Sequence, residues 1–152
     1  MAVTDAPEAA PPDDPEIADE WLVLRRVPPD GYKAGDGRPN SSPTFDLDRT
    51  GRGTSVTIYQ SEQDVENVLR GHEGYGLVSL PVKAWRDHGM TIARMPLDGD
   101  PNHCEIWKPR GTAVKRALAK KSVWVRYPVD FPDHLKGESV NDAFVQDAQA
   151  KA

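Results

Sequence analysis

The chain has 152 residues, of which 19 are Lys or Arg and 24 are Asp or Glu, so its formal charge is −5. This length suits one domain, and 38% hydrophobic residues allow one modest core, while 14 Pro and 12 Gly indicate long loops. No apolar run approaches the roughly 18 residues that span a bilayer, and no signal-peptide pattern opens the chain. The single cysteine, Cys104, excludes an internal disulfide and a cysteine-rich zinc module. We therefore expect a soluble, cytoplasmic protein that does not enter a membrane.

Acidic residues concentrate at the N-terminus. Residues 1–20 contain seven acidic residues and no basic ones, which leaves a charge of +2 for the rest of the chain. The segment is rich in Ala and Pro and offers almost nothing apolar to bury. The sequence predicts a disordered acidic tail over residues 1–19, which either aids solubility or competes with anionic ligands for a basic surface. An α+β domain over residues 20–136 and a helical extension over residues 137–152 complete the expected organisation.

The hydrophobic pattern predicts an alternation of strands and helices. Residues 21–27 indicate a strand that a Pro pair ends, and residues 30–53 indicate a long ordered loop over the domain. The further predicted strands are residues 54–59, 76–80, 90–95, 103–107 and 123–127. Predicted helices begin at Ser61, at Pro81 and after Thr112, and a terminal helix is predicted at residues 139–149. The fold class expected is a single α+β domain with one mixed or antiparallel sheet and three to four short helices.

Basic residues concentrate between positions 108 and 126, where seven Lys or Arg occur without an acidic residue. The run enters a helix that Thr112 is expected to cap, and free amides at a helix N-terminus favour an anion. The residues predicted to bind an anion are Lys108, Arg110, Thr112, Lys115, Arg116 and Lys120. The ligand expected is a nucleotide, a nucleic acid or an acidic protein, and the alternative is an ordinary solvated helix face. The spacing does not match a Walker loop.

Potential metal ligands and nucleophiles gather in one predicted strand, at His103, Cys104 and Glu105. Side chains alternate along a strand, so Cys104 points away from the other two, and at most two ligands share a face. We therefore expect no metal site and no cofactor. A cysteine nucleophile is disfavoured for the same reason, because neighbours on a strand point apart.

Three residues on different predicted strands suggest an enzyme. Arg25 or Arg26 lies on the first strand, Ser55 opens the second, and Glu105 lies on a later one. In this order they resemble the arginine, serine and glutamate of ADP-ribosyltransferase-like domains, which are small, strand-rich and bind NAD. The resemblance implies an Arg on the dinucleotide phosphates, a Ser bracing the cleft, and a Glu stabilising an oxocarbenium-like ribose. Its catalytic residues here are Arg25, Ser55 and Glu105.

Two functional hypotheses follow from the sequence. The first is a small non-catalytic binding or accessory module that holds an anionic ligand or partner at its basic surface. The second is a small NAD-utilising, ADP-ribosyltransferase-like enzyme. Convergence of the Arg, Ser and Glu side chains in one cleft would favour the enzyme.

Overall fold

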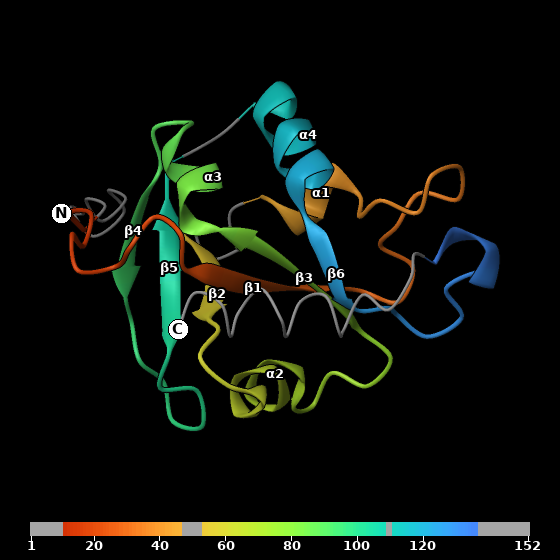
Figure 1. Ribbon diagram of the computed structural model, residues 1–152, viewed down its shortest axis with the longest axis horizontal. Coiled ribbons are helices and arrows are strands. Elements are labelled where there is room, and N and C mark those ends of the chain that lie inside the picture. Colours follow the sequence, from red (N-terminus) through yellow and green to blue (C-terminus); the bar gives the residue numbers. More distant parts are fainter. Residues whose placement is uncertain (1–10, 47–52, 109–110, 137–152) are drawn as a thin grey trace, which may run out of the picture.

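A computed structural model of the chain describes residues 11–46, 53–108 and 111–136. Within this part, six strands form one sheet in the order β4-β5-β2-β1-β3-β6, and every neighbouring pair is antiparallel (Figure 1). The strands are β1 (Leu22–Val27), β2 (Thr54–Ile58), β3 (Gly76–Pro81), β4 (Thr91–Arg94), β5 (His103–Trp107) and β6 (Val123–Arg126). The chain thus forms a single α+β domain, as its pattern of strands and helices predicts.

Helices cover both faces of the sheet. The helical segments are α1 (Ser41–Thr44), α2 (Glu62–Leu69), α3 (Val82–Arg86), α4 (Thr112–Lys121) and the 3-10 turn η2 (Asp133–Leu135). Figure 1 shows α3 and α4 above the strands and α2 below them. We call these sides of the sheet the α4 face and the α2 face.

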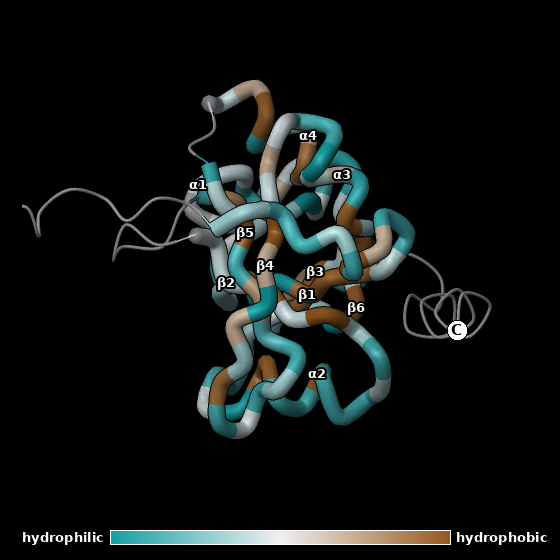
Figure 2. Tube along the Cα trace, turned by 90° about the vertical axis from the view of Figure 1, so that its left-hand side faces the viewer, coloured by the Kyte–Doolittle hydropathy of each residue, from teal (hydrophilic) through white to brown (hydrophobic). Residues whose placement is uncertain are grey.

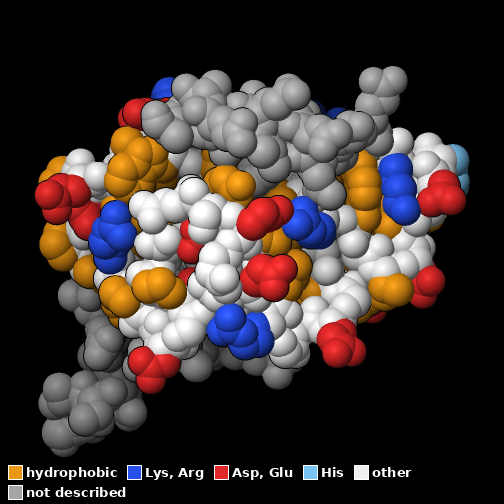
Figure 3. All heavy atoms as spheres, turned by 60° about the horizontal axis from the view of Figure 1, so that its bottom comes forward, with side chains coloured by type: hydrophobic (Ala, Val, Ile, Leu, Met, Phe, Trp, Pro, Cys, Tyr) orange, Lys and Arg blue, Asp and Glu red, His pale blue; other side chains and the backbone are white. Residues whose placement is uncertain are grey.

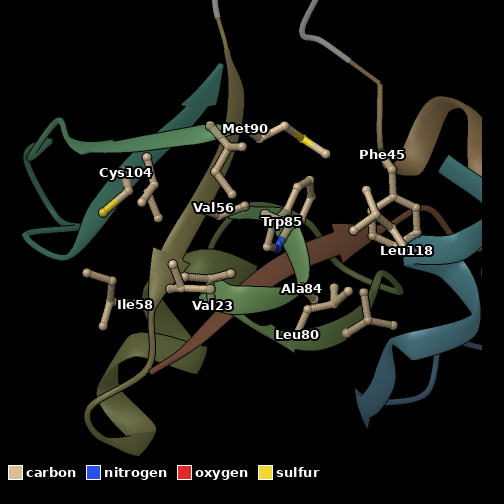
Figure 4. Packing of buried hydrophobic residues seen from close by; sticks show 14 of the residues in the cluster. Val23, Phe45, Val56, Ile58, Leu80, Ala84, Trp85, Met90, Cys104 and Leu118 are labelled. Atoms are coloured by element: carbon tan, nitrogen blue, oxygen red, sulfur yellow. The ribbon is translucent and has the colours of Figure 1, made fainter. Parts of the chain in front are cut away.

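The larger hydrophobic core lies on the α4 face. Trp85 of α3, Leu118 of α4 and Phe45, which follows α1, are buried there against strand residues such as Val23 and Val56. Their side chains point toward one another between the sheet and the helices (Figure 4). The hydropathy of the trace follows this layering, with apolar segments in the interior and polar ones on the outer turns (Figure 2). Burial of these side chains is the main contribution to stability.

A smaller core lies on the α2 face, toward the β3 and β6 side of the sheet. Its buried members are Leu24, Val65, Val68, Leu77 and Val125. Helix α2 begins as predicted, because the carboxylate of Asp64 accepts a hydrogen bond from the backbone N–H of Ser61 at 3.0 Å. This core covers only part of the face, so β5 and β2 carry a different set of residues there.

Residues 13–19 pack along β4, so the predicted disordered tail is too long. The backbone N–H of Asp14 donates to the carbonyl of Ile92 at 2.9 Å, and the N–H of Ile92 donates to the carboxylate of Asp13 at 3.0 Å. Ile17 is fully buried in the larger core. A segment bonded to an edge strand protects that edge and belongs to the fold. Residues 1–10 of the predicted tail lie outside the described residues.

The predicted long loop contains more structure than its composition indicates. It includes a bridge between Tyr32 and Pro39 as well as α1, and Phe45 anchors it in the core. The predicted C-terminal helix at residues 139–149 lies outside the described part. None of the described helices is long and apolar enough to cross a membrane.

Candidate functional site

The predicted anion-binding residues differ in their surroundings, although Thr112, Arg116 and Lys120 all belong to α4. Lys108 follows β5 with a backbone φ of 98°, and Arg110 lies outside the described residues. Thr112 is the first residue of α4 and not its cap, because Gly111 takes the N-cap position. Thr112, Arg116 and Lys120 are exposed.

Lys115 is held by an acidic neighbour and does not stand open to an anion. Its Nζ lies 3.5 Å from the Asp46 carboxylate, and only 13% of its side chain is exposed. The cationic side chains of α4 that are exposed to solvent are therefore Arg116, Lys120 and Lys121. On the opposite side of the molecule, basic and acidic side chains are interspersed and do not gather by sign (Figure 3).

Arg25 does not point toward Glu105. Its Nε donates to the Thr44 carbonyl at 2.8 Å and its Nη1 donates to the Ser55 carbonyl at 3.0 Å. Thr44 belongs to α1, so the guanidinium lies on the α4 face, where Val23 and Val27 of the same strand are buried. Arg25 therefore does not converge with Ser55 and Glu105 in one cleft, which was the condition that would favour the enzyme with this arginine. Arg25 joins β1, β2 and α1.

The neighbouring Arg26 lies on the other face, together with Ser55 and Glu105. Ser55 and Glu105 are directly opposite each other in the β2–β5 ladder, so their side chains share one face. The Nη1 of Arg26 donates to the carbonyl of Val68, in α2, at 3.1 Å. Adjacent strands β1, β2 and β5 thus present an arginine, a serine and a glutamate on the α2 face.

Glu105 is buried and incompletely bonded. The residue is 7% exposed, and its Oε1 has no hydrogen-bond partner in the described part of the chain. Burying a carboxylate without a partner costs free energy, so each such group calls for a structural or functional explanation. The next residue on this face is Trp107, whose buried Nε1–H has no acceptor among the described residues. The buried hydroxyl of Thr91, which lies opposite it, likewise has no hydrogen-bond partner among them.

A cavity of about 130 Å³ opens on the same face, bordered by Arg26 and Ser55 but not by Glu105. It lies between α2, the strands and the turn after β4, and its lining combines apolar with charged side chains. The residues that border it are Leu24, Arg25, Arg26, Ser55, Val56, Thr57, Val68, Leu97, Asp100 and His103. A concave site with a few convergent polar groups is the usual form of a small-molecule site.

Thr57, Asp100 and His103 line one end of the cavity. The Thr57 hydroxyl donates to Asp100 Oδ2 at 2.8 Å, while Asp100 Oδ1 is buried with no donor among the described residues. His103 Nδ1 lies 2.8 Å from the Met95 carbonyl, and a carbonyl only accepts, so Nδ1 carries the proton. The Nε2 of a neutral His103 is then an acceptor.

Sequence reasoning missed this end of the site. Thr57 and His103 are opposite each other in the β2–β5 ladder, and Asp100 belongs to the turn that precedes β5. Thr57 lies beside His103 and Asp100, about forty-five positions later in the sequence, because of the register in which β2 and β5 pair. From the sequence alone, Asp100 is predicted only to lie in a turn.

Cys104 takes no part in this site. It lies on the α4 face in the larger core, and burial raises the pKa of its thiol to about 12. A thiol with that pKa is protonated at neutral pH and is a poor nucleophile. Among the residues that the structure describes, no three His, Cys, Asp or Glu side chains are arranged to hold a metal ion.

Comparison of the chain with protein-family models, with curated proteins and with solved structures finds no significant match. The functional argument therefore rests on the geometry of the α2 face.

Proposed function

We propose that the chain is a small NAD-utilising enzyme of the ADP-ribosyltransferase-like class, with Arg26, Ser55 and Glu105 as its site. The observation that carries the proposal is the buried Glu105 carboxylate, directly opposite Ser55 on the face that also holds Arg26, with an Oε1 that has no partner among the described residues. The resemblance seen in the sequence named Arg25 or Arg26 for the arginine, and the geometry favours Arg26.

The chemistry assigns each residue a role. The bond between the ribose C1′ and the nicotinamide nitrogen breaks, and its electron pair leaves with nicotinamide. Glu105 stabilises the positive charge that develops on the ribose, because a fixed carboxylate in a water-poor site is effective there. The acceptor then bonds to C1′ and gives its proton to water. A guanidinium has five N–H donors, so Arg26 can bind a phosphate while one N–H remains on Val68.

The size of the cavity indicates which part of the dinucleotide it holds. Its volume of about 130 Å³ is well below the roughly 300–1,000 Å³ of pockets that enclose a whole drug-sized ligand. One ring of the dinucleotide enters the cavity, and the rest lies along the surface beyond Arg26.

The test is release of nicotinamide from NAD by the purified full chain, followed by chromatography, with water and added proteins as acceptors. Glu105→Gln keeps the shape of the side chain and removes its charge, so turnover should fall about 100-fold or more while NAD binding persists. Glu66→Gln, at an exposed position of α2, is the matched control and should leave turnover unchanged. Absence of both NAD binding and nicotinamide release in the wild type overturns the proposal, as does full activity of Glu105→Gln.

The second candidate is the binding module with a basic surface. It is supported by α4, which carries Lys115, Arg116, Lys120 and Lys121 and no acidic residue. Affinity for duplex DNA should then fall with salt, with a slope of about −0.9 per phosphate contact. Replacing Arg116 and Lys120 by Gln should flatten this slope, whereas the same change at Lys33 and Arg38, on another surface, should not. Equal effects of the two pairs, or no binding of DNA or ATP, would reject this function.

A further inference from the structure

We propose that the gap between β1 and β2 binds the free carboxylate end of an extended peptide whose last side chain is apolar. The gap is the place where the hydrogen-bond ladder of the two strands is interrupted, and the cavity opens there. The inference goes beyond the proposed function and does not rest on it. A peptide and a ring of the dinucleotide would exclude each other from the same space.

The strands β1 and β2 separate after only two register pairs, at Val23 and Leu24, whereas β1 keeps six pairs with β3. The carbonyl of Leu22 accepts a hydrogen bond from the N–H of Tyr59, which follows β2, at 2.9 Å. Backbone groups alternate in direction along a strand, so Arg26, like Leu22 and Leu24, directs its N–H and C=O toward β2. The register ends before Arg26, which leaves these two groups without a ladder partner on β2.

An arginine side chain takes the place of the missing ladder bond. In a continuous ladder, the next residue to exchange hydrogen bonds with Arg26 would be Ser55. The Ser55 carbonyl accepts instead from Arg25 Nη1 at 3.0 Å. The cavity is bordered by residues 24–26 of β1 and residues 55–57 of β2. Consecutive side chains point to opposite faces, so a cavity bordered by all of them opens between the strands, beside the backbone of Arg26.

Antiparallel pairing specifies which group fits this position. The residue opposite Arg26 would donate its N–H to the Arg26 carbonyl and accept the Arg26 N–H on its own carbonyl. A chain running antiparallel to β1 would next reach Leu24, whose pairing with Thr57 closes the gap. The chain must therefore end opposite Arg26, and its last carbonyl is a carboxylate. Capture of an extended peptide at a strand and of its terminal carboxylate by fixed donors are both established modes of recognition.

The side chain of Arg26 provides further donors for that carboxylate. Its Nη1 is bonded to the Val68 carbonyl at 3.1 Å, and its other guanidinium N–H groups have no partner among the described residues. Bonds from a guanidinium to a carboxylate are among the strong hydrogen bonds of proteins. The charged side chains that border the cavity carry a net positive charge, which favours an anion; they are Arg25, Arg26 and Asp100.

The cavity also offers apolar surface to the last side chain of the peptide. Leu24 and Val68 border it, and so does Leu97, which is 55% exposed. An apolar side chain that covers Leu97 removes this surface from water. The volume of about 130 Å³ limits the enclosed part of the ligand to the end of the peptide.

The experiment titrates the isotope-labelled full chain with acetyl-alanyl-leucine and with its C-terminal amide. The readouts are the backbone amide signal of Arg26 and the ring signals of His103, because both residues border the cavity. The free acid should bind about tenfold or more tightly than the amide, since the amide lacks the charge that the guanidinium binds. Arg26→Gln should bring the two affinities close together. Arg116→Gln removes an exposed charge from α4 and should keep the wild-type preference.

Two surface variants test the apolar part of the site without changing the strands. Leu97→Ser should weaken binding of the free acid severalfold. Val129→Ser removes an apolar side chain of similar exposure, 52%, that does not border the cavity, so binding should not change. Equal effects of the two substitutions would overturn the assignment of the last side chain to this cavity.

The outcomes separate this inference from the proposed function. Equal affinity of the wild type for the free acid and the amide overturns the inference, whether or not Arg26→Gln folds. Absence of binding at millimolar concentration overturns it too, as does an unchanged preference in Arg26→Gln. If nicotinamide is released from NAD in any of these cases, the proposed function stands without the inference. If the preference depends on Arg26 but no nicotinamide is released, the peptide site stands and the enzyme does not.

Discussion

Arg86 in α3 binds Asp13, 73 residues earlier in the sequence, through a salt bridge with an Nη2 to Oδ2 distance of 3.0 Å. The same guanidinium donates to Asp19 at 2.7 Å and to the backbone carbonyls of Ile17 and Asp14 at 2.7 and 2.9 Å. A planar guanidinium, with its N–H donors in fixed directions, binds several acceptors at once better than a lysine ammonium does. One arginine thus fastens residues 13–19 to the helix and to the edge of the sheet.

We expect Arg86→Met to reduce the free energy of unfolding by about 1–3 kcal/mol, because two carbonyls and the partly exposed carboxylates of Asp13 and Asp19 lose their donor while the aliphatic stem is kept. Urea denaturation of the full chain measures this. Lys83→Met is the matched control on the same helix. Its partner Asp87 is exposed, so stability should change little. Equal losses in the two variants would contradict a fastening role for Arg86.

The N-terminal segment shows where composition misleads. Residues 13–19 have the acidic, Pro-containing composition of a disordered tail, yet single contacts decide their state: Ile17 fills the core, and Asp13 and Asp19 bind Arg86. The partner is about seventy residues away in the sequence, and no local pattern reveals it. By contrast, the strands follow from local hydrophobic alternation, which is why their positions along the sequence were predictable.

We expect Gly53→Ala to destabilise the protein by about 1–3 kcal/mol, the usual cost of overpacking. A Cβ at this position would lie 2.6 Å from the carbonyl oxygen of Ile106 and 3.2 Å from the Cβ of Glu105. The first contact is with backbone, so β2 and β5 would have to separate. Gly35→Ala is the control, because a Cβ there meets no atom within 4 Å. Thermal unfolding of both variants tests this, and a similar melting temperature for the two would count against it.

The candidate site was only partly predictable, because it too depends on contacts between residues that are distant in the sequence. Alternation along residues 103–107 correctly separates Cys104 from His103 and Glu105. It also distinguishes Arg25 from Arg26, but which of them faces Glu105 depends on how β1 and β5 are oriented relative to β2. That register is set by pairing across the sheet, so the sequence leaves the choice between the two arginines open.

Cys104 should resist thiol reagents while the protein is folded. Its pKa of about 12, against an ordinary value of 9.0, leaves about a thousandfold less thiolate at mildly alkaline pH. Burial is the main cause, and the nearby Asp100 and Asp14 carboxylates add to it, while Arg94 acts in the opposite direction. Reaction with a chromogenic disulfide reagent should therefore be slow without denaturant and fast in urea. Rapid modification of the native protein would show that Cys104 is accessible.

Tyr59 should make the protein less stable at high pH. Burial raises the pKa of its phenol above the ordinary value of 10.0, and the carboxylates of Glu62 and Asp64 raise it further, while Arg126 opposes them. Between the unfolded and the folded pKa, the unfolded chain has lost a proton that the native protein still holds, so stability falls as the pH rises through this window. Tyr59→Phe removes the titrating group. Its free energy of unfolding should run parallel to that of the wild type up to about pH 9 and decline less steeply above about pH 10. Denaturation curves across this range, with tyrosinate absorbance as a second readout, measure the difference, and parallel curves throughout would show that the phenol ionises at the same pH in both states.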